Sequence, residues 1–391
     1  MYDLLVKDGE VIDPAQKIHA KKDIAISEGK IAALEDEIKA SEAKRVIDAK
    51  GKIVTPGLID LHVHCAPIIT SLGVPPDEIG VETAVTTIVD CGSTGYANFE
   101  GFKRFIIPEA KTDIFAFLHV VPTGHAVQPE TWGWYDANVE ATLKAVEDNR
   151  DIVKGIKMRA MGSVIEQQGA KAIKLAKKMS TEAKLPLMVH FGVWMDEKQP
   201  DSMIDAFMRE LLSNMDKGDI ITHIYTSNRG GVIKPDGTVY PELWDAIKRG
   251  VVLDVANAIF NFSFDIARKG LEQGILPTTL STDFASPNLD SPVVLSLTVT
   301  MSKFLALGLS LEQVIEMTTI NPAKVLGEES RRGSLKVGMQ ADISILKLEE
   351  GDFSFYDRRE KTNVLKGKYQ LIPELTIKSG APIKAAPRYR D

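Results

Sequence analysis

The amino-acid sequence predicts an α/β fold: a (β/α)8 barrel of the TIM type, joined to a small β-sandwich domain formed by both chain ends. Three observations predict it. Eight short apolar runs recur over roughly 250 residues, most of them followed by an amphipathic helical stretch, as in a parallel sheet covered on both faces. Both chain ends carry short strands and glycine turns instead. No glycine-rich phosphate loop follows the first run, which argues against an open doubly wound sheet.

Composition narrows the class of protein further. The 391 residues are 44% hydrophobic and 26% charged, which is an ordinary balance for a globular protein with a large core. The formal net charge of −7 disfavours a nucleic-acid partner, because phosphate contacts need clustered Lys and Arg. With only two cysteines, no apolar run long enough to cross a bilayer and no signal peptide in view, we expect a soluble cytoplasmic protein without a membrane partner.

Residues 1–54 are predicted to form the first part of the β-sandwich. Short apolar runs alternate here with turn signals, and Asp8-Gly9 is a dipeptide typical of a two-residue hairpin turn. Residues 331–391 return to the same pattern and end in a basic tail. We therefore expect the two ends to form one discontinuous β domain beside the barrel.

The barrel itself is predicted to span residues 55–330. Its eight strand candidates lie at 59–65, 86–91, 114–120, 153–158, 187–191, 220–224, 251–255 and 278–281. Helix candidates between them include 169–183 and 201–215, where apolar residues recur on one face. Two more helices are expected at 291–307 and 311–318, and a further short one begins at Asn321-Pro322.

Polar side chains stand at the carboxyl ends of several predicted strands, where barrel enzymes place their active sites. His62 and His64 are two residues apart on the first strand, so their side chains point to the same side. His190, His223 and Asp283 end the fifth, sixth and eighth strands. A lone histidine after a strand is more often a packed core residue, but the joint pattern favours a site for zinc or a similar divalent ion.

Lys157 interrupts the fourth apolar strand. A lysine in such a place usually extends to solvent or pairs with an acid. We favour the alternative that a desolvated amine reacts with carbon dioxide, because the resulting carbamate is an anionic ligand able to bridge two metal ions. Arg159 should point the same way, toward a substrate carboxylate or into a structural salt bridge. Tyr225 and Asn228, just past His223, are candidate hydrogen-bond donors to substrate.

Two further histidines and both cysteines border the predicted site. His119 and His125 flank the third strand, and we assign them to packing or to the surface. Cys65 and Cys91 are expected to be small buried hydrophobic residues and neither nucleophiles nor ligands.

Two segments resemble a known family. TPGLIDLHVH at 55–64 resembles the opening barrel motif of the amidohydrolase superfamily. NPAKVLG at 321–327 and GSLKVGMQADI at 333–343 resemble its closing signature. The resemblance spans nearly the whole chain and implies a barrel joined to a β-sandwich from both chain ends. It also implies a ligand set of His62 and His64 for one metal, His190 and His223 for the other, Lys157 as the bridging carbamate, and Asp283 as ligand and proton shuttle.

A narrower resemblance points to the dihydroorotase-like deacetylases, which cleave small N-acyl amino acids or O-acyl hydroxy acids. It rests on DCGS at 90–93 and KMR at 157–159. The implied reaction is attack of a metal-bridging hydroxide on an acyl amide or ester, with Asp283 passing the proton to the leaving group. Two divalent ions, zinc by preference, a small-molecule substrate and a homo-oligomer are expected.

Two alternatives remain beside this function. Dihydroorotases and hydantoinases, which open cyclic amides, share the same ligand set. A barrel that has lost catalysis and serves as a scaffold is the alternative from another class, and it is disfavoured because every predicted ligand position is filled.

Overall fold

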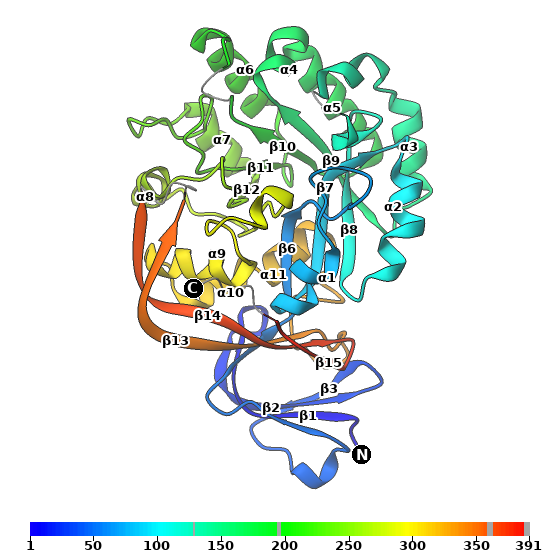
Figure 1. Cartoon of the computed structure of the whole chain (residues 1–391), viewed down its shortest axis with the longest axis vertical. Coiled ribbons are helices and arrows are strands. Elements are labelled where there is room, and N and C mark those ends of the chain that lie inside the picture. The colour runs from blue at the N-terminus through cyan, green and yellow to red at the C-terminus, as the bar shows by residue number, and fades with distance from the viewer. Residues whose placement is uncertain (128–129, 194–196, 358–362, 387–391) are drawn as a thin grey trace.

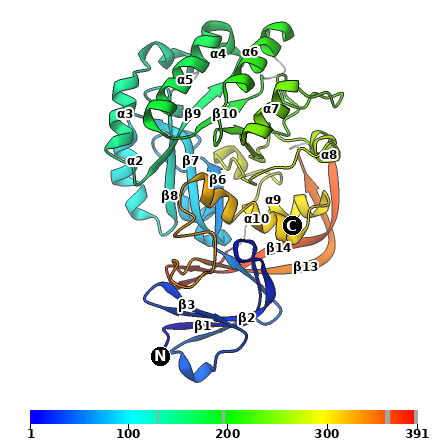
Figure 2. The same ribbon diagram turned by 180° about the vertical axis from the view of Figure 1, so that it is seen from behind.

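In the computed structural model, which describes residues 1–127, 130–193, 197–357 and 363–386, the chain forms two β structures. A curled parallel sheet occupies one end of the molecule, with most of the helices on its outside, and a second sheet made from both chain ends lies at the other (Figure 1). The view from behind shows helices α2 to α7 along the outer face of the parallel sheet (Figure 2).

The parallel sheet has seven strands, and all of its pairings are parallel. In chain order these are β6 (Leu58–Val63), β7 (Val85–Gly95), β8 (Asp113–His119), β9 (Val153–Ala160), β10 (Leu187–Phe191), β11 (Ile220–Thr222) and β12 (Val252–Asp254). They coincide with the first seven predicted runs. Their side chains are almost all buried, as expected for a sheet covered on both faces.

The eighth predicted run, 278–281, is not a strand. Asp254 of β12 forms a single parallel bridge with Thr279, and Val63 of β6 forms another with Phe284. The segment 279–284 therefore contacts both edges of the curled sheet. Between the two bridges Asp283 has a left-handed backbone, with φ of 49°, which interrupts the extended conformation that a strand requires.

The α-helices occupy the intervals between and after the strands. They are α1 (Pro76–Ile79), α2 (Phe99–Phe105), α3 (Val139–Glu147), α4 (Gly162–Gln168), α5 (Ala170–Ala183), α6 (Asp201–Asn214), α7 (Pro241–Arg249), α8 (Phe264–Glu272), α9 (Leu297–Ala306), α10 (Leu311–Glu316) and α11 (Ile320–Val325). In the described ranges none is long and apolar enough to cross a membrane. The cytoplasmic location stays a prediction.

The helices predicted at 169–183 and 201–215 are confirmed to within one residue, whereas α9 begins six residues after the predicted 291. Ser296 explains the late start, because its side chain accepts a hydrogen bond from the backbone N–H of Val299 and caps the helix. The residue before Pro292 is also biased away from the helical conformation.

Both chain ends contribute to the second sheet, as predicted. Its order is β15-β14-β13-β5-β1-β2-β3, with β4 paired to β1. The strands are β1 (Leu4–Asp13), β2 (Ile18–Ser27), β3 (Lys30–Glu35), β4 (Val46–Asp48), β5 (Ile53–Pro56), β13 (Ile343–Tyr356), β14 (Val364–Lys378) and β15 (Ala381–Lys384). The antiparallel pair of β5 and β13 joins the two ends. The sandwich arrangement and the domain limits at residues 54 and 330 stay predictions.

The hairpin turn predicted at Asp8-Gly9 is wrong. β1 continues through these residues, and its register against β2 shifts between Val6 and Gly9. Asp8 takes a φ of 62°, so the dipeptide makes a bulge. A Cβ atom on Gly9 would lie 2.5 Å from Cγ2 of Val54, so the close packing against β5 leaves no room for a side chain at this position. The turn to β2 lies at 14–17, after Asp13.

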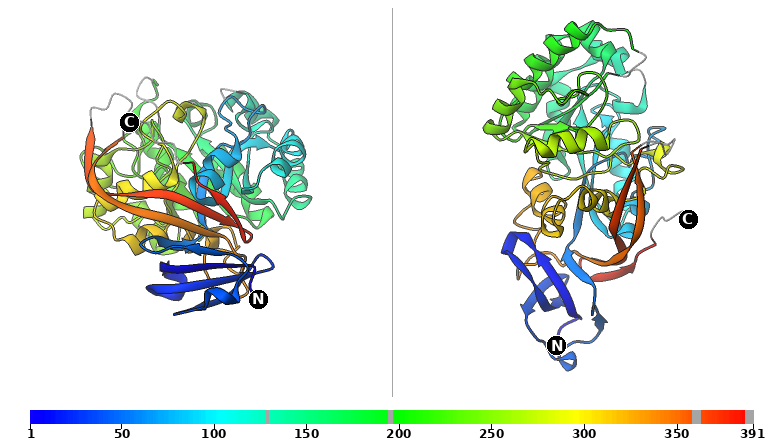
Figure 3. Two further views of the ribbon diagram at one scale, coloured as in Figure 1. Left: turned by 60° about the horizontal axis from the view of Figure 1, so that its bottom comes forward. Right: turned by 90° about the vertical axis from the view of Figure 1, so that its left-hand side faces the viewer.

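The hairpin of β13 and β14 extends beyond the second sheet. β13 pairs with β5 only over residues 343–346, and from 347 onward it pairs with β14 alone. This projecting part rises along the side of the parallel sheet to the neighbourhood of α8 (Figures 1 and 3). At its base, Nζ of Lys378 lies 2.8 Å from carboxylate oxygens of both Asp113 and Asp342, which ties β14 to β8.

Candidate metal centre

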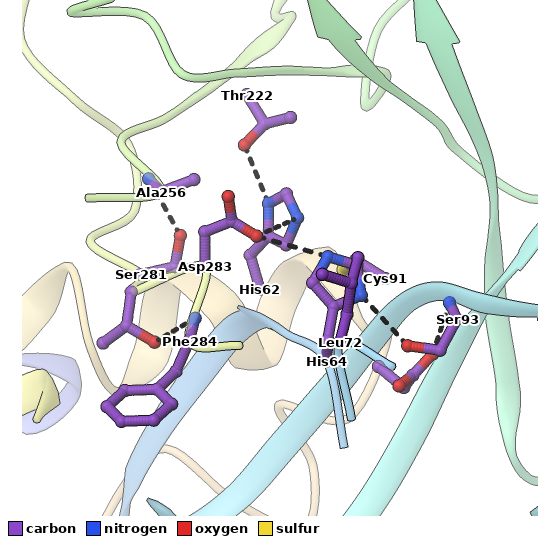
Figure 4. A network of polar contacts seen from close by, with 12 residues as sticks. His62, His64, Leu72, Cys91, Ser93, Thr222, Ala256, Ser281, Asp283 and Phe284 are labelled. Carbon is purple, nitrogen blue, oxygen red and sulfur yellow. Dashed lines mark hydrogen bonds and ion pairs between the residues drawn. The ribbon is translucent and has the colours of Figure 1, made fainter. Parts of the chain in front are cut away.

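Three of the predicted ligands meet at the carboxyl end of β6. Nε2 of His62 and Nε2 of His64 each lie 3.3 Å from Oδ1 of Asp283 (Figure 4). The left-handed backbone at Asp283 directs its carboxylate inward, and its N–H donates to the carbonyl of His62 at 2.7 Å. Burial alone would raise the pKa of Asp283, but the three imidazoles of His62, His64 and His223 hold it well below its usual value.

The structure brings His190 and His223 to the same place. Their ring centroids are 4.2 Å apart, and the centroid of His223 lies 5.3 Å from that of His62. Nε2 of His223 is 3.7 Å from Oδ2 of Asp283. Burial lowers the pKa of His62 to about 4 and that of His223 to about 3. Burial also holds the pKa of His190 well below its usual value, so the rings of His62, His190 and His223 are in the neutral form that binds metal ions.

Hydrogen bonds on the far side of two rings fix which nitrogen carries the lone pair. Thr222 donates its hydroxyl proton to Asp254 at 2.7 Å, so it accepts from Nδ1 of His62 at 3.0 Å. Nδ1 of His223 donates to the carbonyl of Ala256 at 3.0 Å. In both rings Nε2 is left with its lone pair directed toward Asp283.

Two of the imidazoles have a buried Nε2 atom that the described residues leave without a hydrogen bond. Nε2 of His190 and Nε2 of His223 are buried, and neither forms a hydrogen bond within the described part of the chain. Such an atom costs free energy unless something binds it. Neutral imidazole nitrogens around a carboxylate are a donor set that suits zinc and similar divalent ions, so the residues present fit a metal centre.

Asp254 and Ser93 orient the ligands from the side that faces away from Asp283. Sequence reasoning missed Asp254 and gave Ser93 no role beyond the DCGS motif. Asp254 ends β12 and accepts hydrogen bonds from the hydroxyls of Thr222, Thr279 and Ser281. The hydroxyl of Ser93 lies 3.0 Å from Nδ1 of His64. An aspartate at the end of an apolar strand was the available signal for Asp254, because it repeats the pattern that identified Asp283.

Lys157 lies inside the metal centre. It is fully buried on β9, with Nζ 3.2 Å from Nε2 of His62 and 3.5 Å from Sδ of Met188. No carboxylate accepts a hydrogen bond from it among the described residues, and burial lowers its pKa. A Cβ atom on Gly92 would lie 2.7 Å from Cγ of Lys157, and Gly92 has a φ of 89°, so this glycine gives the lysine its space.

A pocket of about 180 Å³ opens beside the ligands. Its lining combines polar and apolar side chains. The polar group includes His64, His125, Arg159, His190 and Asp283, and the apolar group, called the apolar wall, includes Leu72, Ile259, Phe260, Ala285 and Pro287. Arg159 lines the pocket, and its contact with a substrate stays a prediction. His125, assigned to packing or the surface, is buried and has its ring centroid 4.8 Å from that of His64. Asn288, which the sequence did not single out, also lines the pocket.

The two remaining candidate substrate contacts do not line this pocket. Tyr225 is fully buried, donates its hydroxyl proton to the carbonyl of Ile275 at 2.6 Å and stacks on Phe304. The backbone turns at His223, where φ is 67°, and this local direction is not visible in the sequence. Asn228 donates to the carbonyl of Phe260 at 3.1 Å and so holds a pocket-lining segment from outside.

Comparison with known proteins agrees with this geometry. A match to the amidohydrolase family covers residues 53–382. The chain belongs to the amidohydrolase family. It is therefore a hydrolase that acts on C–N bonds, and the matched range contains all six of the residues predicted to hold the metals.

Several relatives of this amidohydrolase are similar over most of their length. A protein described as a deacetylase from Agrobacterium fabrum is 34% identical over 367 residues, which is 93% of this chain and 86% of the relative. A deacetylase from Enterococcus faecalis is 31% identical, covering 97% and 98%. A solved structure of a dihydroorotase has a TM-score of 0.86 at 29% identity, with 99% and 100% covered. One of an adenine deaminase has a TM-score of 0.87 at 30% identity, with 98% and 100% covered.

Proposed function

We propose that this amidohydrolase removes the acyl group from a small N-acyl amino acid or O-acyl hydroxy acid. The observation that carries the proposal is one pocket that joins the imidazole and carboxylate cluster, a guanidinium group and an apolar wall. The two deacetylases described above support it at 34% and 31% identity. We also propose that the segment 279–284 closes the curled sheet into a barrel without forming a regular eighth strand, since it bridges both edges.

We propose two divalent ions, zinc by preference, in this centre. His62 and His64 would hold one ion, His190 and His223 the other, and a carbamate on Lys157 would bridge them with Asp283 as a further ligand. When bound, such ions lower the pKa of a shared water and polarise the substrate carbonyl. Nζ of Lys157 lies 3.2 Å from Nε2 of His62, and no carboxylate of the described residues accepts a hydrogen bond from it, which supports the carbamate.

Asp283 would move the proton. One carboxylate oxygen lies 3.3 Å from the Nε2 atoms of both His62 and His64, and the side chain also lines the pocket. A carboxylate at this position can accept the proton of the attacking water and then donate it to the leaving nitrogen or oxygen. The left-handed backbone at Asp283 and its N–H bond to His62 hold the group in place for both transfers.

Arg159 would select the leaving group. Its guanidinium can form a bidentate pair with the carboxylate of an amino or hydroxy acid. The apolar wall of Leu72, Ile259 and Phe260 would then contact the side chain of that acid. A substrate with one anionic group and one apolar group therefore matches the guanidinium and the apolar wall that line the pocket.

A substrate panel tests the proposal and its main alternative. Zinc-loaded protein is incubated with N-acetyl amino acids, O-acetyl hydroxy acids, dihydroorotate, hydantoin and adenine. Release of acetate from the first two classes is expected. Ring opening of dihydroorotate or hydantoin alone would favour the cyclic-amide alternative, which the dihydroorotase structure supports at a TM-score of 0.86. Ammonia from adenine alone would indicate a deaminase, and no turnover by the metal-replete protein would favour a scaffold.

A further inference from the structure

Ile259 and Phe260 of the apolar wall belong to the segment 257–264, hereafter the wall, which has no strand and no helix before α8 starts at Phe264. Residues 258–261 line the pocket and lie between the end of β12 and the start of α8. From within the parallel-sheet unit, the N–H of Asn257 donates to the carbonyl of Ser281 at 2.9 Å, and Asn228 contacts Phe260 and Asn261. The end of this wall, at Phe264, is held by a different part of the chain.

Asp357, at the tip of the β13–β14 hairpin, contacts the end of the wall. The residue is fully buried, and its Oδ2 accepts a hydrogen bond from the backbone N–H of Phe264 at 2.8 Å. Phe264 is the first residue of α8, where a negative charge is favourable because backbone N–H groups point outward. Asn363, on the other side of the hairpin tip, donates to the same oxygen at 2.8 Å. The contact between Asp357 and Phe264 joins residues 93 positions apart in the sequence.

Lys303 of α9 makes a second connection between the hairpin and the wall. Its fully buried Nζ donates to the carbonyl of Tyr356 at 2.8 Å, to that of Val293 at 2.7 Å and to Oδ1 of Asn257 at 3.3 Å. Burial lowers the pKa of Lys303 to about 7, and the nearby charge of Asp357 opposes this shift. One ammonium group thus contacts the hairpin tip and the start of the wall.

An aromatic layer includes two side chains of the same loop. Phe262 and Phe264 pack edge to face with centroids 5.5 Å apart, and Nζ of Lys303 lies 5.6 and 5.7 Å from their ring centroids. Tyr225 and Phe304 extend the layer, each with its ring centroid within 6.5 Å of that of Phe262. The loop is therefore packed through Phe262 against Tyr225 and Phe304, and the N–H of Phe264 is bonded by Asp357 of the hairpin.

We propose that the β13–β14 hairpin is a positioning arm for the substrate pocket. Asp357 and Lys303 hold residues 257–264 where they bound the pocket, and so they act on substrate binding through the wall. The interpretation of this wall as a substrate contact rests on the proposed function. The proposal explains why β13 and β14 continue past the second sheet, since residues 347–356 pair only with β14 and end at α8.

Hydrogen–deuterium exchange tests the arm without any substrate. In the metal-loaded full chain, Asp357→Ala should raise the exchange rate of peptides covering 257–264 about tenfold, the loss expected for a hydrogen bond to a charged group. Peptides covering 58–64 and 187–191 should be unchanged. Asp357→Asn should restore slow exchange, because its carboxamide oxygen still accepts from Phe264. Asn363→Ala removes only the second donor to Asp357 and should raise the exchange rate of the 257–264 peptides about threefold. This variant provides the test if Asp357→Ala does not fold.

Lys378→Met is the matched control. Lys378 is a buried cation on the same β14 strand, but it pairs with Asp113 and Asp342 at the base of the arm and does not line the pocket. The control variant should lower the melting temperature and leave exchange at 257–264 as in the wild type. Unchanged exchange at 257–264 in folded Asp357→Ala and Asn363→Ala would overturn the proposal that the hairpin positions this loop, independently of the hydrolytic activity of the variants.

Kinetics then test the connection to substrate. With an N-acetyl amino acid that the wild type hydrolyses, Asp357→Ala should raise KM about tenfold and change kcat less than threefold, with unaltered metal content. Asp357→Asn and Lys378→Met should keep the wild-type KM. Faster exchange with an unchanged KM would overturn the link to the pocket. Faster exchange in a protein that hydrolyses no acyl substrate would contradict the proposed function and leave the arm supported.

Discussion

Thr222 accepts a hydrogen bond from His62 on the side of the ring that faces away from Asp283, with Oγ1 of Thr222 3.0 Å from Nδ1 of His62. Asp254 sets the direction of this hydrogen bond, because the Thr222 hydroxyl has one proton and donates it to Asp254 at 2.7 Å. The Asp254 carboxylate, which is linked to His62 through Thr222, thereby determines that Nε2 of His62 carries the lone pair. The same carboxylate accepts from Ser281, two residues before Asp283, so it connects both halves of the ligand set.

Thr222→Val should weaken metal binding. Valine has nearly the same shape but cannot accept from Nδ1 of His62, so the proton can move to the nitrogen that faces the metal. We expect zinc affinity to fall roughly 10- to 100-fold, measured by competition with a chelator. Thr142→Val, which alters a buried hydroxyl on α3, is the control. Wild-type affinity in Thr222→Val would show that this contact does not orient the ligand.

Asp283→Asn should separate turnover from metal content. The carboxamide keeps the size of the side chain but cannot accept and release the proton. We expect kcat to fall roughly 10²- to 10⁴-fold, while metal analysis finds most of the ion still bound by the four histidines. A metal-replete variant with near-normal turnover would exclude Asp283 as the proton carrier.

Lys157 should carry a carbamate. Protein prepared in ¹³C-labelled bicarbonate is expected to show a carbamate carbon signal that disappears in Lys157→Met. The variant should also lose at least half of its bound metal, because the bridging anion is gone. If the labelled signal persists in Lys157→Met, the carbamate is not on this residue.

Arg159→Gln should discriminate between substrates. Loss of a bidentate ion pair predicts an increase in KM of about 10- to 100-fold for N-acetyl amino acids. The corresponding N-acetyl amino acid amides carry no carboxylate, so their KM should change little. An equal increase in KM for both series would mean that Arg159 has a structural role.

The ion cluster at the base of β14 should make the fold sensitive to acid. Burial raises the pKa of Asp113, but Lys378 and Arg332 outweigh it and hold that pKa below the ordinary value of 3.8. A carboxyl group whose pKa is lowered on folding stabilises the protein above 3.8 and loses this contribution as the pH falls through its folded-state pKa. Urea titrations at pH 7 and near pH 3 should show a smaller loss of stability on acidification in Asp113→Asn than in the wild type.

The part of the site that sequence reasoning found depends on short-range periodicity. His62 and His64 share a strand face because side chains alternate, and His190, His223 and Asp283 were found because each ends an apolar run. The contacts of Tyr225 and Asn228 were not predictable, since they follow from the left-handed backbone at His223. Asp357 and Lys303 were also out of reach, because their partners at Phe264 and Asn257 lie 93 and 46 residues away.

Metal titration with acetate release as the signal tests the central claim most directly. Protein stripped by a chelator receives increasing zinc in the presence of an N-acetyl amino acid panel. Acetate release should rise from zero and saturate near two equivalents of zinc per chain. Acetate release that survives stripping, or that stays absent from the panel at saturating zinc, would contradict a metal-dependent deacetylase.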